Sequence, residues 1–344
     1  MNGNFGSISA LAAEVERLEE QKDDFLVPGN RMRMVGDNRT LAIDGEGDYP
    51  LNQYAHGQLA EYLKIPRAYY DRIGSVEELR ALNVNALLRK RPDERRLVRT
   101  LEGTARAVVS DKFKPLDNGL MMRAILPALQ EHEVKVVSST LTNTRMYLQV
   151  VFPKVQEQVS VGDVVQAGLT FRNSEVGAGS YEVEELIWRL WCENGAIGAS
   201  VLRKVHVGRK VGELEEDYNI YRDDTIRAEL ESFRLRTRDV VSFAITDAGF
   251  QQTVNKMRRA KGEEIEDPVK TVERVGKKYD LSEKAGEELI AGMARDKDFS
   301  RYGLGQSITA MAKGLEDRNR QYDLEKIGFK VLTGDAKEWA ELVD

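Results

Sequence analysis

The sequence predicts an α+β fold, with a central antiparallel sheet, flanking helices and a helical C-terminal region. Three observations support this prediction: helical periodicity near the N-terminus, strand-like runs joined by short polar turns in the middle, and a highly charged helical pattern from about residue 213 onward. We therefore divide the chain into a mainly helical N-terminal region that packs on the core (1–90), an antiparallel β-rich core domain (91–212) and a charged helical C-terminal region (213–344).

The N-terminal region contains the first helical pattern. Apolar residues recur at helical spacing over 7–22, which predicts a short amphipathic helix. The segment 31–42 predicts a pair of strands around Asp37-Asn38. A helix over 54–63 ends at Ile65-Pro66, because the residue before a proline is pushed out of the helical region. Further helix is expected at 67–73 and 76–90.

The middle of the chain contains the strands. Residues 95–101 and 104–110 are expected to pair across the Glu102-Gly103 turn, and a helix follows over 118–130 with Asn118 as its N-cap. A second hairpin, 134–141 with 145–152, and the strands 164–172, 181–191 and 197–207 complete the sheet. The C-terminal helices are expected at 224–243, 249–259, 268–279, 282–293, 305–317, 323–327 and near 337–342.

The composition is that of a globular protein with a single cysteine. Apolar residues make up 41% and charged residues 31%, the formal net charge is −6, and the pI is about 5.5. Cys192 alone can form neither an intramolecular disulfide nor a zinc cluster, which fits a reducing compartment. The N-terminus lacks the pattern of a signal peptide, and no apolar run approaches the roughly 20 residues of a membrane span. We expect a soluble cytoplasmic protein with no membrane partner.

Catalytic signatures are absent from the sequence. It contains no P-loop, no dinucleotide-binding fingerprint and no Gly-x-Ser-x-Gly motif. His56, His132 and His206 are far apart in sequence and do not have the spacing of metal ligands. Cys192 stands in a Leu-Trp-Cys run and is expected to be a buried, inert thiol. We predict no catalytic residue, no metal and no cofactor.

Positive charge is concentrated between residues 87 and 114. This segment has nine cations and four acidic residues, a net charge of +5, so the rest of the chain carries −11. Lys and Arg side chains that neutralise phosphates release counterions and give sequence-independent affinity for nucleic acid. The alternative, that these cations form a solvated face, stays open. The predicted nucleic-acid-binding residues are Arg95, Arg96, Arg99, Arg106, Lys112 and Lys114, with Arg172, Arg203, Lys204 and His206 in second rank.

Aromatic residues near these cations are candidates for stacking on bases, although aromatic residues are more often part of the core. Two Gly-rich polar loops between strands are a further feature. Their backbone amides could form a nest for a ligand or anion, or the loops could be tight structural turns whose Asn side chains cap their own backbone. The aromatics are Phe113, Tyr147, Phe171 and Tyr181, and the loop residues are Asn173, Ser174, Glu175, Gly177, Gly179, Asn194 and Gly195.

Several blocks of sequence resemble a family of phage- and plasmid-borne proteins known as domain of unknown function 932. The blocks are DFLVP (24–28), QL (58–59), IPRAYY (65–70), RAVVSDKFKPLDN (106–118), GD (162–163), NSEVGAG (173–179), CENG (192–195) and HVG (206–208). Members more often have Thr where Glu193 stands. The family has no established activity, but the resemblance implies a mobile-element setting, with genes for DNA replication and recombination as common neighbours.

Together these observations predict a non-enzymatic protein that binds and anneals single-stranded DNA, in the cytoplasm of a bacterial host cell. It is expected to work as a homo-oligomer, with recombination or replication proteins as further partners. Annealing requires that the backbone be held while base edges stay free to pair, without active-site chemistry. Two alternatives stay open: a host-protein interaction factor that uses the helices beyond about residue 213, and a metal-dependent phosphodiesterase built from Asp163, Glu175, Glu193 and His206.

Overall fold

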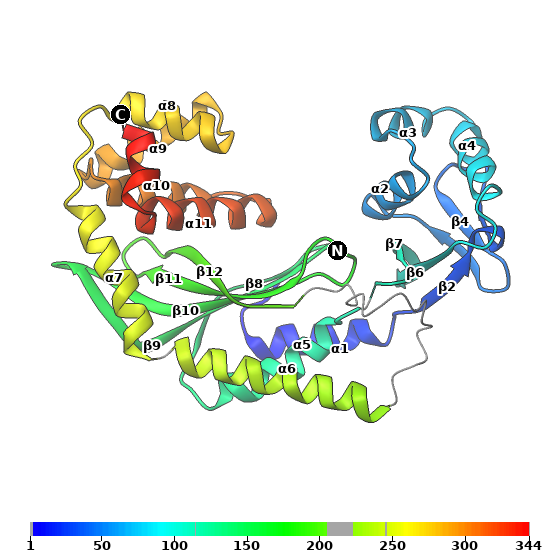
Figure 1. The fold of residues 1–344 in the computed structure, drawn as a ribbon, viewed down its shortest axis with the longest axis horizontal. Helices are drawn as coiled ribbons and strands as arrows, with labels where there is room; N and C mark the ends of the chain where they lie inside the picture. Colours follow the sequence, from blue (N-terminus) through cyan, green and yellow to red (C-terminus); the bar gives the residue numbers. More distant parts are fainter. Residues whose placement is uncertain (1–2, 114, 205–222, 245, 344) are drawn as a thin grey trace.

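The computed structural model describes residues 3–113, 115–204, 223–244 and 246–343, and it has the predicted α+β fold (Figure 1). Its centre is a six-stranded antiparallel sheet with the order β1-β8-β9-β10-β11-β12. Strands β8 to β12 follow one another in sequence and in space, and the N-terminal β1 pairs with β8. The strands are β1 (Gly3–Asn4), β8 (Lys135–Leu141), β9 (Met146–Ser160), β10 (Asp163–Asn173), β11 (Tyr181–Arg189) and β12 (Asn194–Lys204).

Three helices cover one face of this sheet: α1 (Ile8–Glu19), α5 (Asn118–Gln130) and α6 (Asp223–Ala244). The side chain of Ser7 caps the N-terminus of α1, and Leu11, Val15 and Leu18 are buried as the predicted amphipathic pattern requires. Full burial of one such side chain stabilises the fold by about 1.5–3 kcal/mol. α5 has the predicted bounds, but its N-cap is one residue earlier than predicted, at Asp117.

The C-terminal helices lie on the side of the opposite face, and three of them, at residues 247–261, 301–313 and 318–333, contact the sheet. Alternate residues of β9 point to different sides: Leu148 and Val150 belong to the core under α1 and α5, whereas Tyr147 packs on Tyr322 of α11. The predicted short helix at 323–327 is part of α11, whose buried positions include charged residues that conceal its helical period. The helices are α7 (Asp247–Lys261), α8 (Pro268–Tyr279), α9 (Glu283–Asp296), α10 (Arg301–Lys313), α11 (Arg318–Thr333) and α12 (Ala336–Val343).

Residues 24–110 form a smaller unit with its own core. Its first sheet is β2-β6-β7 and its second is β3-β4-β5, and three helices pack on them. The elements are β2 (Asp24–Pro28), the short helix η1 (Gly29–Arg31), β3 (Met32–Met34), β4 (Thr40–Ile43), β5 (Gly47–Pro50), α2 (Gln53–Tyr62), α3 (Arg67–Ile73), α4 (Leu79–Leu88), β6 (Arg95–Leu101) and β7 (Thr104–Ser110).

The hairpin of β6 and β7 forms where predicted, but the expectation that it joins the central sheet is wrong. Glu102 and Gly103 both have positive φ, which suits a two-residue hairpin turn. β6 pairs with β2, so that Leu97 stands opposite Leu26. The physical reason is burial, because Val98 and Val108 complete the core formed with α2 and α4.

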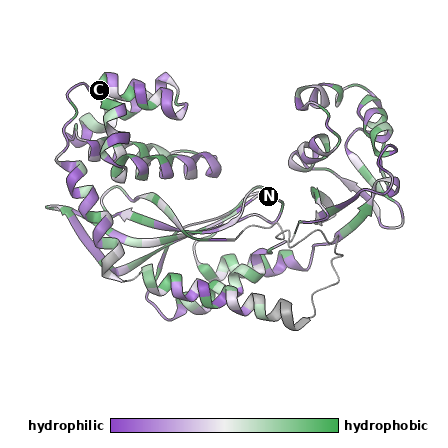
Figure 2. Ribbon diagram, viewed as in Figure 1, coloured by the Kyte–Doolittle hydropathy of each residue, from purple (hydrophilic) through white to green (hydrophobic). Residues whose placement is uncertain are grey.

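The N-terminal unit and the helices α8 to α11 lie at the two ends of the molecule in Figure 1, with the central sheet between them. Hydrophobic residues are frequent in the sheet and in α5, whereas α11 carries many hydrophilic residues (Figure 2). No helix in the described parts of the chain is both long and apolar enough to span a membrane.

Candidate functional site

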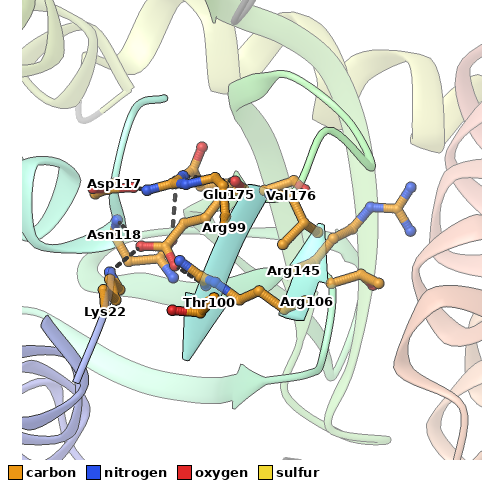
Figure 3. A network of polar contacts seen from close by, with 12 residues as sticks. Lys22, Arg99, Thr100, Arg106, Asp117, Asn118, Arg145, Glu175 and Val176 are labelled. Carbon is orange, nitrogen blue, oxygen red and sulfur yellow. Dashed lines mark hydrogen bonds and ion pairs between the residues drawn. The ribbon is translucent and has the colours of Figure 1, made fainter. Parts of the chain in front are cut away.

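Glu175 is the centre of a buried polar network between the N-terminal unit and the central sheet (Figure 3). Its side chain, 5% exposed, lies in the loop between β10 and β11. The Lys22 Nζ atom donates to its Oε1 at 2.6 Å, the backbone N–H of Asn118 donates to the same oxygen at 2.7 Å, and Arg106 Nη1 donates to Oε2 at 2.5 Å. Burial acts to raise the pKa of this carboxyl, but Arg106 and Lys22 together hold the pKa well below its usual range. Glu175 is therefore an ionised carboxylate held by two cations.

Arg99 extends this network to three separate segments. Its guanidinium donates to Asp24 of β2, to Asp117 before α5 and to the backbone carbonyl of Glu175, and the side chain is 1% exposed. Arg99 and Arg106 were both predicted to contact phosphates of nucleic acid. In the structure both are buried and paired with carboxylates, so they hold the fold at this junction. The alternation of side chains along a strand identifies which residues share a face, but it does not say which face another part of the chain covers.

The loop 173–180 has the geometry of a structural turn. The Ser174 hydroxyl accepts hydrogen bonds from the backbone N–H groups of Val176 and Ala178, and Gly177 has a φ of +80°. Asn173 turns inward and donates to the carbonyl of Leu116 and to Asn118. A side chain at Gly179 would approach the guanidinium of Arg172, at 3.0 Å from its Nη1. The loop thus directs Glu175 into the interior.

The second predicted loop lies at the other end of β11. Asn194 is buried and donates to Gln306 Oε1 at 3.1 Å and to Thr309, both on α10. A Cβ at Gly195 would lie 2.8 Å from the side chain of Leu186 on the neighbouring strand β11, so the backbone at Gly195 passes close to that side chain. Since the length of β11 separates the two loops, their residues do not form one site.

The other predicted cations have different environments. Arg95 and Lys112 are exposed. Arg172 pairs with Glu182 at 2.6 Å and lies over the ring of Tyr322, and the exposed Arg203 is 3.3 Å from Glu182. Lys114, His206 and the side chain of Lys204 lie outside the residues that the structure describes.

The predicted stacking aromatics are core residues. Phe113 is 7% exposed, and Tyr147, Phe171 and Tyr181 are fully buried. Cys192, predicted to be buried, is partly exposed beside Arg189, and desolvation raises the pKa of its thiol.

The carboxylates of the phosphodiesterase alternative do not converge. Asp163 is held by Arg189 and Tyr302, Glu175 lies in the network described above, and Glu193 is exposed beside Lys313. Within the described ranges, no three His, Cys, Asp or Glu side chains are grouped so that they could hold a metal ion. His206 lies outside those ranges.

Within the cation-rich stretch 87–114, exposed positive charge remains in residues 89–96, which we call the basic segment. It has five cations and two acidic residues in eight positions. Arg89, Lys90 and Arg95 are exposed. Arg96 lies over the ring of Tyr62 at 3.8 Å, and Arg91 lies over the same ring at 5.1 Å.

A cavity of about 320 Å³ adjoins the Glu175 network, and a second of about 780 Å³ runs along α2. Asn52, Asn143 and Thr144 line both. Arg145 and Lys22 line the first cavity, and sequence reasoning did not select either of them. The only available signal for Arg145 was its place at the end of a polar turn, Thr142-Asn143-Thr144, between two apolar strands.

No protein-family model, no curated protein and no solved structure matches this chain. The functional assignment therefore depends on the geometry described above.

Proposed function

We propose that this protein binds single-stranded DNA through the basic segment and anneals strands without enzymatic chemistry. The observation that carries the proposal is the exposure of this segment, with a net charge of +3 on a chain whose net charge is −6. A local concentration of cations on an acidic protein attracts a polyanion to one place on the surface.

The stacking of Arg96 and Arg91 on Tyr62 supports the proposal. A guanidinium held against an aromatic ring loses less side-chain entropy on binding to a phosphate. Arg91 Nη1 also donates to Glu94 at 3.3 Å, so Arg96 is the better placed of the two for a phosphate. Tyr62 itself is 7% exposed, so it orients the arginines and offers no face to a base. We therefore assign recognition to phosphates, which leaves base edges free to pair during annealing.

The predicted relation to domain of unknown function 932 supports a setting in DNA replication or recombination by association only. Homo-oligomerisation, a bacterial cytoplasmic location and partners in recombination stay part of the same proposal.

The test is fluorescence anisotropy of labelled single-stranded and duplex DNA over a salt titration. We expect micromolar or tighter binding to single strands that weakens steeply with salt. For the Lys90→Glu/Arg95→Glu variant, the slope of log K against log salt should fall by about 0.7 for each phosphate contact removed. The matched control is Lys284→Glu, an exposed cation on α9, which should bind as the wild type does.

Two outcomes oppose the proposal. Absence of binding at low salt removes DNA as a ligand, and an unchanged salt slope in the double variant removes the basic segment as its site. A further outcome concerns annealing alone. If the wild-type protein binds single strands but does not accelerate the pairing of complementary oligonucleotides, the proposal of binding stands and that of annealing is withdrawn.

A further inference from the structure

Arg106 has two buried hydrogen-bond donors without a partner. The residue lines the cavity of about 320 Å³ beside Glu175, and its side chain is 9% exposed. Its Nη1 atom donates to Glu175 Oε2, but its Nε and Nη2 atoms have no hydrogen-bond partner among the described residues. Buried donors are nearly always paired in folded proteins, so an acceptor is expected at these two atoms.

The two unpartnered atoms lie on one edge of the guanidinium plane. Nε and Nη2 together form the fork that donates two parallel hydrogen bonds to the two oxygens of one carboxylate. The bond from Nη1 to Glu175 holds the guanidinium in place and leaves this edge unused. The donors of Arg106 therefore fit an acceptor group with two oxygens.

The charges around the cavity leave a surplus of one positive charge. It is lined by the cations Lys22, Arg106 and Arg145 and by the carboxylates Glu102 and Glu175. Two of these groups lie away from the buried part of the site: the Arg145 guanidinium points away from Arg106 toward α11 (Figure 3), and Glu102 is 42% exposed. The remaining buried groups, Lys22, Arg106 and Glu175, again leave one positive charge. Both counts indicate an anion with a single charge.

Part of the cavity lining is apolar. It includes Val15 and Leu18 of α1, Leu101 of β6 and Leu141 of β8. A ligand that removes apolar surface from water gains about 25 cal/mol for each Å² covered. The lining therefore favours an anion with an apolar body over a small hydrated ion.

We infer that the cavity beside Glu175 binds a small monocarboxylic acid in its ionised form, with the carboxylate on the Nε/Nη2 edge of Arg106 and the apolar body against the apolar lining. Such a ligand has the single charge that the lining leaves unbalanced and the planar pair of oxygens that the fork fits. The volume of about 320 Å³ is at the lower end of small-molecule sites, which range from about 300 to 1,000 Å³, so the ligand is small.

This site is separate from the basic segment and does not depend on the proposed DNA binding. Arg106 is buried in the junction, whereas Lys90 and Arg95 are exposed. A phosphodiester of DNA also carries one negative charge, so the test compares the carboxylate with a monoanionic phosphodiester.

The test is isothermal titration calorimetry and thermal melting of the full chain with sodium hexanoate. Three comparison compounds each change one feature of this probe: acetate lacks the apolar body, hexanamide lacks the charge, and dimethyl phosphate carries the charge on a phosphodiester. We expect saturable heat and a rise in melting temperature with hexanoate, and at least tenfold weaker binding of each comparison compound.

Two variants separate this site from the basic segment. Arg106→Lys keeps the positive charge but removes the fork, and it should weaken hexanoate binding at least tenfold. The Lys90→Glu/Arg95→Glu variant should bind hexanoate as the wild type does.

A further variant covers the case in which Arg106→Lys does not fold. Thr104 follows the hairpin turn, is partly exposed and lines the cavity, so Thr104→Trp should obstruct the cavity and weaken hexanoate binding at least tenfold.

Absence of saturable hexanoate binding to the wild type overturns the inference, because water alone then satisfies the two donors. Equal hexanoate affinity in the wild type and Arg106→Lys overturns the placement, as does equal affinity in Thr104→Trp where Arg106→Lys does not fold. Loss of hexanoate binding in the Lys90→Glu/Arg95→Glu variant overturns the separation of the two sites. Hexanamide or dimethyl phosphate binding as tight as hexanoate overturns the choice of a carboxylate, and acetate binding as tight overturns the apolar body.

Discussion

Lys22 and Glu175 are 153 residues apart in sequence, and their side chains form an ion pair of 2.6 Å in which both are at least nine-tenths buried. The pair connects the segment after α1 to the loop after β10, and Arg106 joins it from β7. A buried carboxylate with two cations is stable only while all three charges are present, because any one left unpaired has lost its hydration without compensation.

Replacing Glu175 by Gln should therefore destabilise the protein strongly. The change leaves the buried Lys22 and Arg106 without their carboxylate, and breaking a buried ion pair in this way costs about 3–5 kcal/mol. Urea unfolding measures the loss. The control is Glu46→Gln, which removes an exposed pair with Arg31 and should cost about 0.5 kcal/mol or less. Equal effects of the two changes would contradict the central role of Glu175.

Arg99 and Arg95 lie on one face of β6, but the same substitution should lower the stability of the protein strongly at Arg99 and very little at Arg95. Arg99→Met leaves Asp24 and Asp117 without their shared cation and should lower the free energy of unfolding by about 3 kcal/mol. Arg95→Met changes an exposed side chain and should stay within about 0.5 kcal/mol of the wild type. Unfolding and DNA binding measured on both variants separate structural from ligand-binding cations. A stable Arg99→Met protein that has lost DNA affinity would restore Arg99 to the binding surface.

His56 should make the protein sensitive to mild acid. Burial, reinforced by Arg80 and Arg67, lowers the pKa of His56 to about 4, and its Nδ1 is 2.8 Å from the Tyr70 hydroxyl. The unfolded chain, with a pKa near 6.5, then binds more protons than the folded one between these values. Stability is complete above pH 6.5 and falls as the pH drops toward 4.

His56→Gln removes this titration, so its free energy of unfolding should change less between pH 7 and pH 5 than that of the wild type. Unfolding by urea at the two pH values measures the difference. The lowered pKa of Glu175 also makes stability fall in acid, but Glu175 is present in both proteins, so its contribution cancels in the comparison. Identical pH slopes in the two proteins would show that His56 is not the group responsible.

Asn194 should behave as a structural residue at the start of β12. Asn194→Ala leaves its partners on α10 unpaired in a buried place, with an expected loss of about 1–3 kcal/mol. Asn255→Ala on the exposed side of α7 is the matched control and should stay within about 0.5 kcal/mol. A variant as stable as the wild type would favour the alternative in which this loop is kept for a ligand.

Local structure could be predicted from the sequence better than the partners of each element. Two local signals were sufficient. The helical spacing of apolar residues up to Leu18 predicted α1, and the Glu102-Gly103 turn predicted the hairpin of β6 and β7, and the structure has both. The pairing of β6 with β2 was not predictable in this way, because a strand pattern specifies its own alternation and not the segment about 70 residues away that lies beside it.

The candidate site was predicted least well, for the same reason. Arg99 and Arg106 have the residue type of a surface cation, and only the distant Asp24, Asp117 and Glu175 explain why they are buried. In α11, Arg318 and Glu325 pair with each other at buried positions, so the helix extends well beyond the residues that its apolar pattern marked. Buried charge pairs thus conceal both a site and a helix from a pattern of apolar residues.

The pairing of β1 with β8 affects the order in which the chain can fold during synthesis. Asn4 hydrogen-bonds Thr140, 136 residues later, and the whole N-terminal unit is made between them. During synthesis α1 therefore emerges from the ribosome well before α5 and β8, the segments that cover Leu11 and Val15. The unit of residues 24–110 can form its own core first, and until α5 and β8 are made the apolar face of α1 stays exposed to water. The helix α1 is therefore made before the segments that cover it, and its apolar face is covered only after α5 and β8 have been made.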